Sequence, residues 1–270
     1  MDGPDLPDPG QDGRFWVASP REPGDPVALR LFCFPHAGAG GATFFEWGRR
    51  LPGHVQVVGV HLPGRGTRIH EAPFDSVAAI VSALSRAIGR WDDAPSVFFG
   101  HSFGGVLAYE LARSLAREAP GSTPRALLMS SCPAPHVPPR RSYLLHELPR
   151  GEFFQELGRM NGLSAGAIRN DKLLDLIEPA LRADIKAREL WSLAARSAPP
   201  PDPLAIPIHP LCGDADPFVA PGDVAQWGAY TTDLRPAVLF EGGHFHFAAA
   251  PDRLLAVVAD ILDTHSGPAP

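Results

Sequence analysis

Short runs of apolar residues alternate along this chain with longer stretches in which apolar residues recur every three or four positions. The runs are nearly continuous, as is typical of parallel strands covered on both faces, and the recurring stretches have the period of helices with one buried face. Strand and helix in alternation predict an α/β fold with a doubly wound, mainly parallel central sheet. The predicted strands span residues 28–34, 55–61, 97–99, 126–131, 206–212 and 238–240, and the predicted helices span 43–51, 77–88, 104–115, 224–230 and 251–262.

Two proline clusters, at 133–139 and 199–203, interrupt this alternation. Because proline lacks an N–H and restricts the residue before it, such clusters limit where helices begin and end. The residues between them have helical periodicity throughout, with an apolar stripe that fits either core packing or the inner face of a lid over a cavity. We therefore expect one α/β domain over 14–270 with an inserted helical lid at about 133–203, preceded by a disordered, proline-rich tail over 1–13.

Composition excludes several classes of protein. A net charge of −6 provides no basic surface for nucleic acid or an anionic membrane, and no apolar run approaches the length of a membrane span. The acidic N-terminus has neither the basic nor the apolar region of a secretory signal. Cys33, Cys132 and Cys212 are far apart and have no metal-ligand spacing, so we expect buried thiols in a reducing compartment. These features predict a cytoplasmic protein with neither nucleic acid nor membrane as partner.

The strongest chemical signal is Gly100-His-Ser102-Phe-Gly104, directly after a predicted strand and directly before a predicted helix. The G-x-S-x-G pattern alone is weak, and an ordinary glycine-rich turn could produce it. In this context, however, a serine on a sharp strand-to-helix turn projects its hydroxyl above the edge of the sheet. We therefore interpret Ser102 as a nucleophile.

A serine nucleophile needs a histidine base and a carboxylate that orients it, and both should follow later strands in the order acid, then histidine. Asp214 and Asp216 follow one predicted strand, and His244 and His246 follow the next. We prefer Asp216, because Asp214 is placed to bond nearby backbone, and His244, which follows two glycines at the loop apex. The His-x-His pair could also suggest a metal, but no further ligand cluster accompanies it, so we expect no metal.

Small residues over 35–41, after the first predicted strand, suggest a loop for an oxyanion. Here the backbone N–H of Ala37 would point to the same place as the N–H of Phe103, stabilising negative charge on a carbonyl oxygen. A plain tight turn is the structural alternative. A dinucleotide-binding fingerprint is matched only in part, because the third glycine is missing and no acidic ribose ligand follows.

Four motifs together, Phe-Pro-His-Ala-Gly-Ala-Gly, Leu-Pro-Gly-Arg-Gly, Gly-His-Ser-Phe-Gly-Gly and Gly-Gly-His-Phe, resemble the type II thioesterases that accompany polyketide synthases and nonribosomal peptide synthetases. Leu181-Arg-Ala-Asp184 followed by Glu189 is also similar to that family, and the likeness covers about residues 32–247. The resemblance implies an α/β-hydrolase fold and a triad of Ser102, Asp216 and His244. One departure is His246, where the family usually has an aromatic or aliphatic residue.

The same resemblance implies an activity and a partner. The expected reaction is hydrolysis of acyl thioesters from the phosphopantetheine arm of acyl or peptidyl carrier proteins, either to remove aberrant or stalled groups or to release product. No cofactor enters such a mechanism. Two alternatives stay open: a carboxylesterase or lipase of the same fold, and a non-catalytic module that binds acyl chains or carrier domains.

Overall fold

The computed structural model describes residues 16–18, 27–91, 93–160, 163, 165–249 and 251–267. The tail predicted over residues 1–13 lies outside these ranges. Within them, Cys33, Cys132 and Cys212 are free cysteines, and their side chains are buried, as expected.

A central sheet organises the described part of the chain, in the order β1-β3-β2-β4-β5-β6-β7, with β8 beside β6. All neighbouring strands are parallel except β1, which runs antiparallel to β3. β7 and β8 pair with successive parts of the long strand β6, so they act as one interrupted edge. The strands are β1 (Trp16–Ala18), β2 (Leu29–Phe34), β3 (Val55–Val60), β4 (Ser96–His101), β5 (Leu127–Ser130), β6 (Leu204–Gly213), β7 (Thr231–Leu234) and β8 (Val238–Phe240).

Helices cover both faces of this sheet because its central strands are apolar on both. Phe32 and Phe34 of β2 pack in a cluster with α2 (Val77–Ile88) and α3 (Phe103–Glu118). Leu31 and Cys33, which alternate with them, pack on the opposite face in a cluster that includes α9 (Pro251–His265). Successive side chains of one strand thus point to opposite faces of the sheet and belong to two separate hydrophobic cores.

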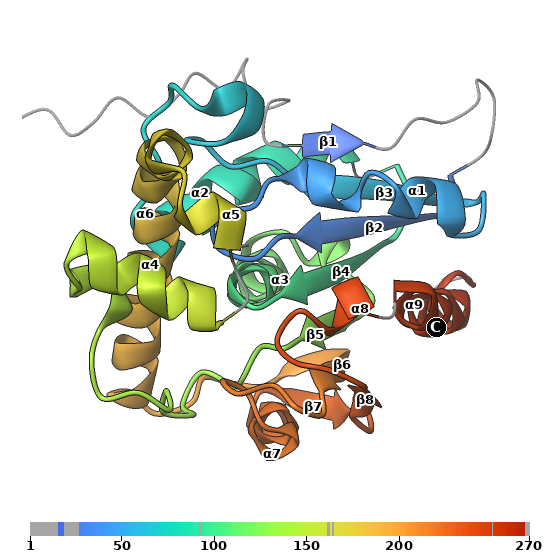
Figure 1. Cartoon of the computed structure of the whole chain (residues 1–270). Helices are drawn as coiled ribbons and strands as arrows, with labels where there is room; N and C mark the ends of the chain where they lie inside the picture. The colour runs from blue at the N-terminus through green and yellow to red at the C-terminus, as the bar shows by residue number, and fades with distance from the viewer. Residues whose placement is uncertain are drawn as a thin grey trace, which may run out of the picture.

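Residues 133–203, here called the insertion, connect β5 to β6. They contain α4 (Arg150–Arg159), α5 (Ala165–Ile168) and α6 (Asp171–Arg196), preceded by the short helix η6 (Leu145–Glu147). These helices share a small apolar core of their own that includes Phe153, Leu157 and Leu174. In Figure 1 the arrows of β2 and β4 point toward the side on which α4 and α6 lie, so the insertion stands over the carboxyl edge of the sheet.

Five of the six predicted strands differ from the structure by only a few residues at their ends, and 238–240 is exact. The helix predicted over 43–51 is wrong in detail. A 3-10 turn, η2 (Gly41–Phe44), comes first, with Gly41 packed directly against the backbone of Gly59, and α1 (Trp47–Arg50) follows. Helix α1 ends at Arg50, because Pro52 requires Leu51, the residue before it, to be extended.

The second correction concerns residues 224–230. The helix α7 (Pro221–Ala225) begins earlier, where the Asp223 carboxylate accepts the amide of Ala220, and it tightens into the 3-10 turn η7 (Gln226–Ala229). The indole N–H of buried Trp227 there donates to the carbonyl of Cys132 at 2.8 Å. Strand β7 was not predicted, because its sequence, Thr-Thr-Asp-Leu, has no apolar run.

Candidate active site

Ser102 occupies the turn between β4 and α3, with backbone angles of φ 55° and ψ −116° that side-chain-bearing residues rarely adopt. Its neighbours explain how the chain holds this turn. A Cβ on Gly104 would lie 1.9 Å from the Phe34 carbonyl oxygen, and one on Gly100 would lie 2.4 Å from the Gly104 carbonyl oxygen. The glycines of the motif are therefore required by close backbone packing, which leaves the Ser102 hydroxyl projecting from a rigid support.

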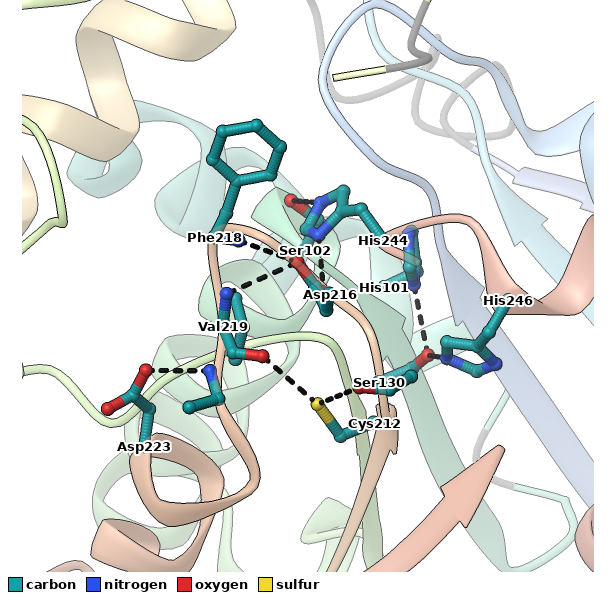
Figure 2. A network of polar contacts seen from close by, with 12 residues as sticks. His101, Ser102, Ser130, Cys212, Asp216, Phe218, Val219, Asp223, His244 and His246 are labelled. Atoms are coloured by element: carbon teal, nitrogen blue, oxygen red, sulfur yellow. Dashed lines mark hydrogen bonds and ion pairs between the residues drawn. The ribbon is translucent and has the colours of Figure 1, made fainter. Parts of the chain in front are cut away.

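Three side chains from three loops form one hydrogen-bond chain, shown in Figure 2. The Ser102 Oγ lies 3.0 Å from His244 Nε2, and His244 Nδ1 lies 2.8 Å from Asp216 Oδ2. Asp216 follows β6, His244 follows β8, and both side chains are buried. Because the strands are parallel, their carboxyl ends bring these residues together over large sequence separations. Such a chain can transfer a proton from a hydroxyl to an imidazole held in one orientation.

The Asp216 carboxylate is held in its charged form. Burial raises its pKa, but the hydrogen bond and charge of His244 and the amide of Phe218 outweigh burial, so the pKa lies below its ordinary value. The other carboxylate oxygen accepts the amides of Phe218 and Val219 at 2.9 and 3.2 Å. This carboxylate can therefore orient the Nδ1–H tautomer of His244 and oppose a positive charge on the ring.

Asp214 and His246, the neighbours of Asp216 and His244, do not belong to this chain of hydrogen bonds. Asp214 accepts the backbone amide of Gly242 at 3.0 Å, as expected. His246 is buried, stacks on Phe240 and lies 3.0 Å from the hydroxyl of Ser130, which is also 2.9 Å from His101. The line from His101 through Ser130 to His246 runs beside the Ser102 chain in Figure 2 without joining it.

Burial keeps the histidines around His244 neutral. It lowers the pKa of His36 and His246 to about 4, and that of His101 well below its ordinary value, with repulsion from a charged His244 adding to each. The His101 ring lies 5.2 Å from the His244 ring, centroid to centroid. His244 is thus surrounded by uncharged rings, so a proton that reaches it does not meet a fixed positive charge among them.

Two backbone amides lie beside Ser102, that of Ala37 from the loop after β2 and that of Phe103 from the start of α3. Ala37 and Phe103 both line the same cavity as Ser102, and neither amide donates to another described residue. The next amide, that of Gly38, donates instead to the Asp184 carboxylate of α6 at 2.8 Å. Gly38 also has φ +79°, and a Cβ there would lie 2.9 Å from Leu181. Helix α6 therefore clamps the loop directly beside Ala37.

Asp184 is itself fixed by a buried ion pair with Arg65, which follows β3. The guanidinium donates to both carboxylate oxygens, at 2.9 Å for Oδ1, and both side chains are almost fully buried. The pair joins the insertion to the sheet domain at the point where the loop needs support. Sequence reasoning placed Asp184 and Arg65 only in family motifs and gave neither a role, because their contact spans 119 positions.

A cavity of about 510 Å³ opens onto Ser102, His244, Ala37 and Phe103. Its outer wall comes from the insertion and is mainly apolar. The residues of that wall include Leu157, Met160, Leu163, Ile177, Leu181 and Ile185. The apolar stripe of the sequence therefore faces both the core of the insertion and the cavity, and the two interpretations of the stripe are compatible.

Comparison with known proteins identifies the family. Residues 29–264 match the thioesterase domain. The chain belongs to the thioesterase family. It is 34% identical to thioesterase PikA5 of Streptomyces venezuelae over 87% of this chain and 81% of that protein. It is 31% identical to the gramicidin S biosynthesis protein GrsT of Aneurinibacillus migulanus, over 80% and 82% of the two chains.

A solved thioesterase also shares the fold. The RedJ thioesterase from the prodiginine biosynthetic pathway of Streptomyces coelicolor superposes with a TM-score of 0.79 at 34% identity, covering 90% of this chain and 93% of that one. The thioesterase described here is thus an α/β-hydrolase, as the sequence predicted. Among its described helices, none is long and apolar enough to cross a membrane.

Proposed function

We propose that this thioesterase hydrolyses acyl groups from the phosphopantetheine arm of acyl or peptidyl carrier domains in polyketide or nonribosomal peptide biosynthesis. The observation that carries the proposal is the chain of hydrogen bonds from Ser102 through His244 to Asp216. It lies at an apolar cavity in a member of the thioesterase family. Its similarity to the gramicidin S biosynthesis protein GrsT and to the RedJ thioesterase from the prodiginine biosynthetic pathway supports a carrier domain as the partner. Three buried, unpaired cysteines support a cytoplasmic location.

The roles follow from the geometry. His244 Nε2 takes the proton of the Ser102 hydroxyl as that oxygen attacks the thioester carbonyl, and Asp216 holds the tautomer that allows it. The amides of Ala37 and Phe103 donate to the oxyanion, each lowering the barrier by about 3 kcal/mol. As the carbon–sulfur bond breaks, the leaving sulfur, whose thiol has a pKa of about 8.5, takes the proton from His244 Nε2, and the imidazole is again free to act as a base. Water activated by His244 then releases the acid and restores Ser102.

The insertion acts in this proposal as a lid. Its apolar wall accommodates the acyl chain. The phosphopantetheine arm is thin enough to enter the cavity, so the carrier domain itself stays at the surface. Apolar walls with a few placed polar groups are typical of sites that bury such ligands.

One experiment separates this proposal from its alternatives. The purified protein is given the same acyl group as a carrier-protein thioester and as a simple oxygen ester, and is also treated with a fluorophosphonate probe. We expect labelling at Ser102 and higher kcat/KM for the carrier thioester. Higher kcat/KM for the oxygen ester would indicate a carboxylesterase or lipase. A protein that binds acyl-carrier domains but is neither labelled nor active would be a binding module.

A further inference from the structure

Arg188 is a cation in the wall of the active-site cavity. It lies in the part of the wall that the insertion contributes, which is the part that accommodates the acyl chain in the proposed function. It belongs to α6, and Leu181, Ile185, Arg188 and Ser192 line the cavity from one face of that helix. Among the described residues, the Arg188 guanidinium has no hydrogen-bond or ion-pair partner. A guanidinium carries five N–H donors, so this side chain brings an unused set of donors to the cavity.

The other charged groups of this wall already have partners. Arg141 pairs with Glu189 at 2.6 Å, and Arg140 pairs with Asp223 at 3.4 Å. Glu189, which follows Arg188 directly, accepts from Arg141, from the amides of Leu145 and His146, and from the His146 ring. The Glu189 carboxylate therefore has its acceptors in use, and although its charge favours the charged form of Arg188, it accepts no hydrogen bond from that guanidinium.

The Arg188 side chain is half-buried. Burial lowers the pKa of Arg188, the repulsion of Arg141 adds to this effect, and the interactions with Cys132 and Glu189 oppose it. A cation that is partly withdrawn from water without a hydrogen-bonding partner is stabilised when an anion binds it. A guanidinium binds a carboxylate with two parallel hydrogen bonds. The cavity wall thus contains a guanidinium that could pair with an anion in the cavity.

The position of Arg188 suggests which anion this is. Leu181 touches the loop beside Ser102, and Arg188 lies seven residues further along the helix, about 10 Å at 1.5 Å per residue. Arg188 also lies near Cys132, which packs against Gly105 at the start of the nucleophile helix. An acyl chain of a few carbons reaches that far from the thioester carbonyl, whereas the phosphate of the arm stays beside the carrier domain.

We propose that Arg188 binds a carboxylate at the distal end of the acyl group, so that this thioesterase accepts carboxyl-bearing acyl thioesters as a substrate class. The inference rests on the proposed function, since it concerns the acyl group that Ser102 attacks. It also predicts chain-length selection, because the contacts of Asp184 with Gly38 and Arg65 set one distance between α6 and the loop beside Ser102 when the cavity is closed.

The test compares paired pantetheine thioesters, which lack the phosphate. Malonyl, succinyl, glutaryl and adipyl groups are each matched with the methyl-terminated acyl group of equal carbon number. For at least one pair, we expect Arg188→Met to lower the ratio of the two kcat/KM values, carboxyl-bearing to methyl-terminated, by about tenfold or more. Arg188→Lys, which keeps the charge, should restore part of the ratio. Arg140→Gln is the matched control, because Arg140 already pairs with Asp223, and its ratio should stay within about twofold.

The outcomes are distinguishable. If the wild-type protein hydrolyses none of the thioesters, the proposed function fails. If it hydrolyses them but every ratio is independent of Arg188, the inference alone is wrong. A loss that appears only when the same acyl groups are carried on phosphopantetheine would assign Arg188 to the phosphate and overturn the carboxylate. Thermal unfolding of each variant checks folding, and Arg188→Gln replaces Arg188→Met if the latter does not fold.

Discussion

Ser102 combines a hydroxyl that lines the cavity with a backbone conformation at φ 55° that only glycine adopts without strain. We expect both Ser102→Ala and Ser102→Gly to lower kcat by several decades, because the attacking oxygen is lost. The two should differ in stability, since alanine keeps the Cβ that causes the strain. Thermal or chemical unfolding should show Ser102→Gly more stable than Ser102→Ala by about 1 kcal/mol. Near-normal turnover of either variant would exclude Ser102 as the nucleophile.

The two acids and the two histidines form matched pairs for substitution. Asp216→Asn and His244→Ala should each reduce kcat/KM by several decades, because they break the chain to Ser102. Asp214→Asn and His246→Ala, which alter a loop contact and the bond to Ser130, should cost about tenfold or less. Steady-state kinetics of the four variants decides, and a reversal within a pair would move the role to the neighbouring residue.

Helix α6 supports the oxyanion loop through the buried pair of Asp184 and Arg65. Asp184→Asn leaves Arg65 buried without its charge partner, so we expect a loss of about 3–5 kcal/mol in unfolding free energy, together with a fall in kcat as Gly38 loosens. The matched control is Lys186→Gln on the same helix, which breaks an exposed pair with Asp75 and should cost about 0.5 kcal/mol or less.

A double variant separates positioning from stability at this site. Replacing both partners with apolar residues, Arg65→Met with Asp184→Leu, removes the buried charges and should recover most of the stability. The amide of Gly38 still lacks its acceptor, so kcat should stay low. Recovery of kcat along with stability would show that the ion pair only stabilises the fold.

The insertion is predicted to open and close over the cavity. Hydrogen exchange should therefore be faster across α4 than across β4, whose residues lie buried within the sheet. Met160→Trp narrows the cavity and should reduce hydrolysis of long acyl chains more than that of acetyl, whereas Leu176→Trp, at an exposed position of α6, should change neither. Equal protection of α4 and β4 from hydrogen exchange, together with an unchanged chain-length preference in Met160→Trp, would contradict this prediction. It would show that the insertion is packed like the rest of the core.

The pH dependence of stability follows from the neutral histidines buried around the site. The pKa of His246 falls from 6.5 to about 4 on folding, as does that of His36, so between these values the unfolded chain binds protons that the folded chain does not. The contribution of these two neutral histidines to the free energy of unfolding is therefore full above about pH 6.5 and is lost as the pH falls toward 4. A shift of this size contributes about 3 kcal/mol per histidine at full effect.

Thermal unfolding at pH 7.5 and pH 5.0 measures this contribution. His246→Phe keeps a ring against Phe240 but cannot take up a proton, so it should lose less melting temperature between the two pH values than the wild-type protein does. His70→Gln, at an exposed position, is the control. An unchanged loss in His246→Phe would exclude His246 as a source of the acid sensitivity.

Most of the framework could be predicted from the sequence, because it depends on short-range physics. Apolar runs specify buried strands, and the glycines of Gly100-His-Ser102-Phe-Gly104 mark the sharp turn at Ser102 within a local motif. The order of strands and loops placed Asp216 and His244 at one edge of a parallel sheet, and their side chains do meet Ser102 there. Strand β7 escaped prediction because polar residues at a sheet edge leave no apolar signal.

Only the tertiary structure decided the contacts that connect distant parts of the chain. The bond of Asp184 to Gly38 spans 146 positions, and the approach of His246 to Ser130 spans 116. No local pattern encodes such partners, because each depends on how helices and loops pack once the sheet has formed. The same holds for Arg188, which the sequence presents as one charged residue of an amphipathic helix. That Arg188 has no hydrogen-bond partner among the described residues emerges only when the neighbouring carboxylates are seen to accept from other donors.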